Sequence, residues 1–189
     1  MKSMSIQKQQ GFSLVELLLV LGVIALIAIA AFIIYPSVQA GAQANTEASN
    51  ATAIVAGVKN LFGAKGNYQG LTDAVACQAQ VYPSTMVGGA TTASTCALSA
   101  NKPKSAWGEA VTLAVGAAPY NQFAIHYSKI PSATCTKLLS NIAANFDTVG
   151  TTAIGSTDIK ASGQAPDPVA IATKCAAANP VTDLYFTSK

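Results

Sequence analysis

The pattern of apolar and polar positions divides the chain into an N-terminal rod and a mixed remainder. A polar leader, residues 1–10, is followed after a short junction by an apolar run from Leu17 to Tyr35, in which the Tyr35 phenol is the one polar group. The run meets the length that a helix needs to cross a bilayer, about 20 residues at ~1.5 Å of rise each. Glu16 lies one residue before it. This pattern predicts a single membrane-spanning helix.

Behind the run, the pattern becomes that of an amphipathic helix. The positions predicted to form its apolar stripe are Val38, Ala42, Ala53, Ile54, Val58, Leu61 and Phe62. The polar positions assigned to other faces are Gln39, Gln43, Glu47, Asn50 and Lys59. Gly63 and Gly66 supply a helix stop. We therefore predict one long helix over residues 12–63, kinked or locally opened at Pro36, which removes an i to i−4 hydrogen bond.

The rest of the chain reads as short helices and strands of a single domain. Helices are predicted over residues 71–81, 133–146 (with Ser132 as N-cap) and 169–177, and strands over residues 110–115, 122–129, 149–154, 158–161 and 184–187. Residues 86–95, rich in Gly, Thr and Ala, predict an exposed loop. Trp107 is expected to anchor the core.

Composition and charge argue against nucleic-acid binding and against catalysis. Charged residues make up 10% of the chain, no arginine is present and the formal net charge is +3, so the chain lacks a basic stripe for phosphates. With one histidine, His126, and no phosphate-cradling glycine motif, the sequence predicts neither an active site nor a cofactor. We expect His126 to face solvent or to be hydrogen-bonded rather than to bind a ligand. Asp158 and Asp167 fall in loops, but nothing else there supports a calcium site, and no metal is predicted.

The four cysteines predict disulfides. Cys77, Cys96, Cys135 and Cys175 form no Cys-x-x-Cys pair and lie far from the histidine in sequence, so zinc spacing is absent. An even count in an exported domain favours disulfides over free thiols. Three connectivities are open. We prefer Cys77–Cys96 and Cys135–Cys175, which close the shortest loops and are worth roughly 3 and about 4 kcal/mol in the loop-entropy model.

The junction between leader and run resembles the signal of type IV prepilins. Gly11-Phe12-Ser13-Leu14-Val15-Glu16-Leu17 matches that signal position by position, behind a short basic leader. A secretory signal peptide is instead cleaved after a shorter apolar stretch. The resemblance implies cleavage between Gly11 and Phe12 and N-methylation of Phe12, both by the prepilin peptidase. Gly11 has no side chain, so a protease can approach its carbonyl closely.

The resemblance also implies a fold and its division. The type IV pilin fold is α+β, with a long kinked N-terminal helix packed on a mostly antiparallel sheet in a disulfide-bonded globular domain. Type IVb pilins have a disulfide that closes a C-terminal loop, which would be Cys135–Cys175 here. The implied parts are a leader (residues 1–11), a transmembrane and polymerisation half-helix (12–36), an amphipathic half-helix (37–63) and an extracellular globular domain (64–189).

Glu16 and Pro36 are the residues expected to matter for assembly. Glu16 would lie about 6 Å from the new N-terminus at ~1.5 Å per residue. A carboxylate at the centre of a bilayer costs roughly 2.5–3.5 kcal/mol, so it is expected to find a partner. The α-amine of Phe12 on a neighbouring subunit would offset that cost and set the axial register. The alternative is that Glu16 simply favours the positive end of the helix dipole. Pro36 would mark a segment that melts or curves in the filament.

These features together predict a major subunit of a type IV pilus. Chain size and two disulfides favour a IVb-like class, although the short leader and Phe12 resemble type IVa. The expected partners are copies of the chain, the prepilin peptidase, the pilus assembly machinery and, before assembly, the inner membrane. The filament would be extracellular and would serve adhesion, aggregation or conjugative contact. The alternatives are a type II secretion pseudopilin, a minor or tip adhesive pilin and a membrane-anchored enzyme or sensor, the last disfavoured by the missing active site.

Overall fold

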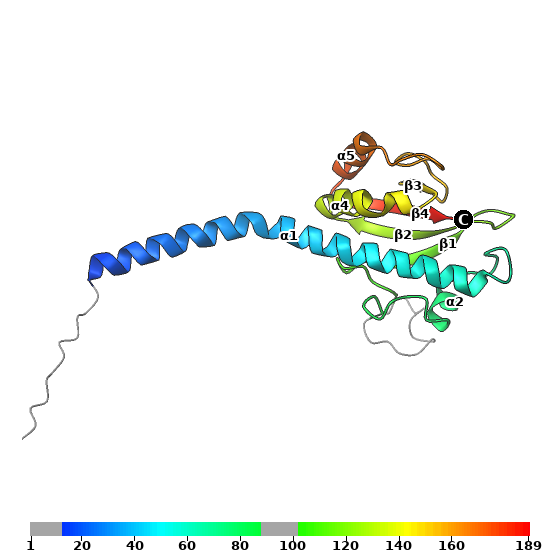
Figure 1. The fold of residues 1–189 in the computed structure, drawn as a ribbon, viewed down its shortest axis with the longest axis horizontal. Coiled ribbons are helices and arrows are strands. Elements are labelled where there is room, and N and C mark those ends of the chain that lie inside the picture. The colour runs from blue at the N-terminus through cyan, green and yellow to red at the C-terminus, as the bar shows by residue number, and fades with distance from the viewer. Residues whose placement is uncertain (1–12, 88–101) are drawn as a thin grey trace, which may run out of the picture. The chain divides into compact units, whose positions relative to one another are not determined.

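The computed structural model describes residues 13–87 and 102–189, which form two units. One unit comprises the described residues up to Val38, and the other the described residues from Gln39 to Lys189. Helix α1, Leu14–Phe62, contributes residues to both units (Figure 1). It contains Pro36. The long helix predicted from the sequence is therefore confirmed over the described residues, and it ends one residue before Gly63.

The globular unit is built on a four-stranded antiparallel sheet. The strands are β1 (Val111–Val115), β2 (Phe123–Ile130), β3 (Thr148–Gly150) and β4 (Val181–Ser188), in the order β1-β2-β4-β3. The C-terminal strand thus lies inside the sheet, with Ile125 of β2 opposite Phe186 of β4. The predicted strands at 110–115 and 122–129 are confirmed, and the terminal strand is longer than expected.

Within the described residues, three shorter helices complete the unit: α2 (Asp73–Gln78), α4 (Ser132–Ile142, followed by the 3-10 turn η1, Ala143–Asn145) and α5 (Pro168–Ala177). The side chains of Thr72 and Asp167 cap the N-termini of α2 and α5 by accepting hydrogen bonds from the backbone amides of Val75 and Val169. The predicted cap of α4 is wrong, because Pro131 occupies the N-cap position and Ser132 is already helical.

The predicted edge strands are also largely wrong. Of the predicted edge strand at residues 149–154, only the part within β3, Thr148–Gly150, pairs with β4. Beyond it, the amide and hydroxyl of Thr151 donate to the loop carboxylate of Asp158 instead. Residues 158–161 contribute a single bridge, Val149 to Lys160. Met86, expected in an exposed loop, is buried in the core, and residues 88–95 of that loop lie outside the described residues.

The core lies between the sheet and a layer formed by α4 and the second half of α1. Two hydrogen bonds join these helices, from Thr134 to Gln43 (3.1 Å) and from Asn141 to Asn45 (2.9 Å). The fully buried side chains that fill the layer include Ile54, Val58, Tyr127, Leu138 and Phe186. Trp107 packs against this core, with its ring 5.5 Å from that of Tyr127, as predicted.

The apolar stripe of α1 differs from the predicted one. Its buried positions are Ala40, Ala44, Glu47, Asn50, Ala51, Ile54, Val58 and Phe62. Val38, Ala42, Ala53 and Leu61 are exposed instead. Glu47 and Asn50 were assigned to polar faces but are buried. Both make hydrogen bonds in the core, and buried polar groups are tolerated when they are hydrogen-bonded.

The disulfides agree with the predicted pairing as far as the described residues extend. Cys135 of α4 is bonded to Cys175 of α5, with their Cα atoms 5.7 Å apart. Cys77 is also disulfide-bonded, and its predicted partner, Cys96, lies outside the described residues. No described cysteine is a free thiol.

Candidate assembly surface

The first half of α1 exposes an unbroken apolar surface, here called the apolar rod (residues 14–38). Every large apolar side chain of the rod is exposed, from 46% for Val20 to 80% for Phe32. Within α1 lies a stretch long and apolar enough to cross a membrane, and none of it is buried. Soluble monomers rarely expose apolar patches beyond a few hundred Å². The rod therefore requires a cover, either lipid or other apolar helices.

Two of the residues predicted to matter for assembly or processing, Glu16 and Pro36, lie within the apolar rod. Glu16 lies in the first turn of α1, where a carboxylate is favoured by the positive end of the helix dipole. Pro36 lies inside the helix, two residues before the end of the first unit. Gly11 and Phe12 lie outside the described residues.

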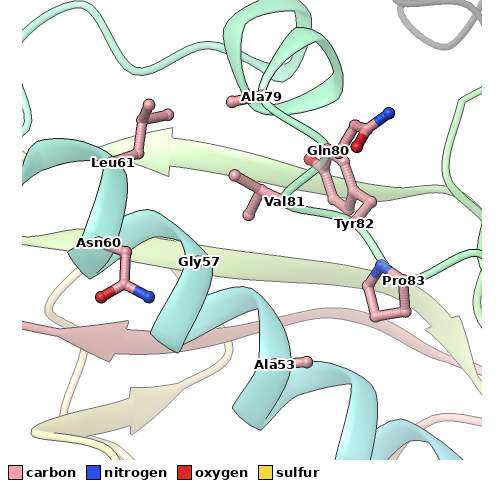
Figure 2. A pocket seen from close by; sticks show the side chains of 9 residues that line it. All are labelled: Ala53, Gly57, Asn60, Leu61, Ala79, Gln80, Val81, Tyr82 and Pro83. Carbon is pink, nitrogen blue, oxygen red and sulfur yellow. The ribbon is translucent and has the colours of Figure 1, made fainter.

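An open groove lies on the globular unit between α1 and the segment after α2 (Figure 2). Its lining residues are Ala53, Gly57, Asn60, Leu61, Ala79, Gln80, Val81, Tyr82 and Pro83. The groove depends on Gly57, because a Cβ there would lie 3.0 Å from the Cγ1 of Val81. The Tyr82 hydroxyl donates a hydrogen bond to Asp73 (2.8 Å), and burial together with that charge raises the pKa of Tyr82. The groove thus offers apolar surface and two amides, which suits contact better than acid–base chemistry.

His126 belongs to a hydrogen-bonded cluster on the sheet face opposite the core. Its Nε2 lies 2.7 Å from Oδ1 of Asp183 on β4, and its Nδ1 lies 3.2 Å from the Thr112 hydroxyl on β1. The ring also stacks on Tyr185, with centroids 4.5 Å apart. A hydroxyl, an imidazole and a carboxylate are the components of a hydrolytic triad, but none of these residues lines the groove. The prediction of a satisfied histidine is confirmed.

The two loop aspartates are engaged by the chain itself. Asp158 accepts hydrogen bonds from the Thr151 amide (2.9 Å) and hydroxyl (2.6 Å) and from the Ser156 hydroxyl (2.6 Å), and it pairs with Lys174 (2.9 Å). Burial alone would raise the pKa of Asp158, but these donors outweigh it and hold the pKa well below its usual value. Asp167 caps α5. Across residues 13–87 and 102–189, no group of three His, Cys, Asp or Glu could hold a metal ion.

Comparison with protein-family models gives two matches that together span most of the chain. Residues 6–32 match the prokaryotic N-terminal methylation motif. Residues 41–189 match the PilS N-terminal model. The chain belongs to the PilS family of type IV pilins. The resemblance to prepilins is thereby confirmed, and this family and its fold are those of structural pilins rather than enzymes.

Among solved structures, this pilin is similar to TcpA, a type IV pilin from the El Tor biotype of Vibrio cholerae. The two chains share 18% sequence identity, the match covers 80% of this chain and 99% of TcpA, and the TM-score is 0.49. No curated protein sequence matches this pilin closely enough to count as a relative.

Three features of the pilin were not predicted from its sequence: the groove, the pairing of His126 with Asp183, and the burial of Glu47. The first depends on tertiary packing of a loop against α1. The second joins residues 57 positions apart, and only the register of β2 and β4 would have indicated it. The third could not be predicted from neighbouring residues, because the backbone amide that donates to Glu47, that of Ala106, lies 59 positions away.

Proposed function

We propose that this pilin is the major structural subunit of a IVb-like type IV pilus and polymerises through the apolar rod. The observation that carries the proposal is the exposure of every large apolar side chain in residues 14–38. Burial of such surface is worth about 25 cal/mol per Å². Inner-membrane lipid would cover the rod before assembly, and the rods of neighbouring subunits would cover it in an extracellular filament.

The proposal includes processing of the N-terminus. The prepilin peptidase would cleave between Gly11 and Phe12, remove residues 1–11 and methylate the new amine of Phe12. The match to the methylation motif, which spans this junction, supports this step. The Glu16 carboxylate would then lie about 6 Å from the amine at ~1.5 Å of rise per residue. Paired with the amine of a neighbouring subunit, it would fix the register between rods.

The division of α1 supports a separate role for each half. Residues 12–36 would insert first into lipid and then into the filament core, whereas residues 37–63 hold the globular domain, residues 64–189, to the rod. The boundary between the two units, after Val38, lies close to this division and supports it. Pro36 lies close to this boundary and removes one helix hydrogen bond there, which would allow α1 to bend or open locally in the filament.

The disulfide between α4 and α5 supports a role outside the cell, because disulfides persist in oxidising compartments. A surface filament built from this chain would serve adhesion, aggregation or mating contact. The pilus assembly machinery would extract the subunit from the membrane.

The deciding experiment is immunogold electron microscopy of sheared surface material, with antibodies against the globular unit. Labelling along the whole length of long fibres, with this chain as their main protein, is the expected result. Labelling confined to fibre tips would indicate a minor or adhesive pilin. Short intracellular structures with impaired secretion and no surface fibres would indicate a pseudopilin.

A further inference from the structure

Glu47 is a fully buried carboxyl group at the contact between α1 and the rest of the globular unit. Its Oε1 accepts hydrogen bonds from the Ala106 amide (2.7 Å) and from the side chain of Asn50 (3.1 Å). Its Oε2 has no hydrogen-bond partner among the described residues, and the same holds for the fully buried hydroxyl of Tyr127. That hydroxyl is close enough to Glu47 to lower the pKa of its carboxyl group. Three separate parts of the chain therefore meet at this one side chain.

The groups that surround Glu47 are neutral. Asn50 comes from α1, the Ala106 amide from the segment before β1, and Tyr127 from β2. The segment after α2 supplies Tyr82, which interacts electrostatically with Tyr127. It also supplies Thr85, whose hydroxyl donates a hydrogen bond to the side chain of Asn50 at 3.2 Å. None of the salt bridges within the described residues includes Glu47.

The two protonation states of Glu47 differ in how well this site suits them. In its neutral form, Glu47 keeps the hydrogen bonds from Ala106 and Asn50 at Oε1 and brings no charge into the site. An ionised carboxylate remains buried without a cation, which is costly. Burial is the largest influence and raises the pKa of Glu47, while the hydrogen bonds from Ala106 and Asn50 and the nearby Tyr127 hydroxyl lower it in part.

We propose that Glu47 is a proton-controlled latch, which in its neutral form holds the second half of α1 on the sheet and in its ionised form loosens it. Because the folded-state pKa lies above the unfolded one, the stabilisation is complete below the unfolded pKa and is lost as pH rises through the folded pKa. Docking of α1 is thus tightest in acid. The latch does not depend on the chain forming a filament.

The latch can be tested on the full chain in detergent by hydrogen exchange of the amides of residues 48–62 between pH 4 and 9, corrected for intrinsic exchange. Between the unfolded-state and folded-state pKa values of Glu47, the ratio of open to closed α1 in the wild type should rise by up to tenfold per pH unit. Above the folded-state pKa, it should level off. Glu47→Gln keeps the shape of the neutral acid. It should match the wild type in acid and be better protected at high pH.

Two further variants keep the test decisive. Glu109→Gln neutralises a half-exposed glutamate that lies 3.6 Å from Lys129, and it should retain the wild-type pH profile. Tyr127→Phe removes a hydroxyl that lowers the pKa of folded Glu47, so the loss of protection should extend to higher pH and its midpoint should rise. Parallel profiles for the wild type and Glu47→Gln would overturn the latch. If Glu47→Gln does not fold, an unchanged midpoint in Tyr127→Phe would overturn it instead.

Discussion

Cys135 and Cys175 join α4 to α5 across 40 residues of sequence, and both are almost fully buried. The loop between them contains β3 and the long turn that follows it, so the bond restricts a large part of the unfolded chain. Helix α5 buries only one other side chain, Ile171, and therefore depends on the disulfide for its position.

We expect the double substitution Cys135→Ser, Cys175→Ser to lower the free energy of unfolding by about 4 kcal/mol, the loop-entropy value for a link of this span. Thermal melting of the full chain in detergent measures the loss, and limited proteolysis should cut first between α4 and α5. A wild-type sample treated with reductant serves as the control. Equal melting temperatures for the oxidised and the serine-substituted chains would contradict the argument.

A second prediction concerns Asp158, which ties the turn after β3 to Lys174 of α5. Asp158→Asn keeps the size of the side chain and removes its charge, and it should cost about 2 kcal/mol at neutral pH, the typical worth of a hydrogen bond to a charged group. The pKa of Asp158 is lowered in the folded state, so its stabilisation is present above the unfolded pKa and is lost as pH falls through the folded one.

Denaturant titrations at pH 7 and in strong acid test this sign. The gap between wild type and Asp158→Asn should be widest at pH 7 and should close in acid. Asp167→Asn is a suitable comparison, because it alters a helix cap in the same loop and leaves Lys174 in place. A gap that stays constant with pH would show that the charge of Asp158 is not what stabilises the turn.

A third prediction uses two glycines of α1. Replacing glycine by alanine in a helix interior gains about 1 kcal/mol from backbone entropy. At Gly41 the new Cβ would meet only the flexible end of Lys137 at 3.5 Å, whereas at Gly57 it would meet Val81 at 3.0 Å and its backbone at 3.4 Å. Gly41→Ala should therefore raise the melting temperature, and Gly57→Ala should gain nothing or lose. Equal gains at both positions would contradict the close approach of Val81 to α1.

Much of the fold was predictable because its signals are local. The apolar rod is defined by length and by an unbroken run, and α5 by a proline at its start and an aspartate cap. The residues around the junction of Gly11 and Phe12 match the prepilin signal in consecutive positions and so pointed to the family. The match of residues 6–32 to the methylation motif confirms that resemblance. The pairing of Cys77 with Cys96 remains a prediction.

What the sequence did not reveal depends on partners far away in the chain. Periodicity assigned Glu47 to a polar face because it considers only the kind of side chain at each position, and glutamate side chains are usually exposed to solvent. The amide of Ala106 and the hydroxyl of Tyr127 reverse that assignment, and neither is visible from the residues near Glu47. The length of β3 was overestimated for a similar reason, since Thr151, the residue after the strand, donates its amide and hydroxyl to Asp158.

The last prediction tests the role of Glu16 in the register of the filament. Glu16→Ala should leave cleavage after Gly11 intact, because the variant retains both residues of the cleavage site. It should assemble poorly, because the amine of Phe12 on the neighbouring subunit would be buried without its carboxylate, and breaking such a pair typically costs 3–5 kcal/mol. Intact mass and N-terminal sequencing of the membrane fraction measure processing, and electron microscopy measures filament number.

Glu47→Gln supplies a matched control, since it neutralises the other glutamate of α1 but leaves the rod unchanged. Filaments from this control should form normally, while those from Glu16→Ala and Glu16→Gln should be few. If both Glu16 variants gave filaments in wild-type number, the carboxylate would not set the register, and the helix-dipole explanation of Glu16 would stand instead.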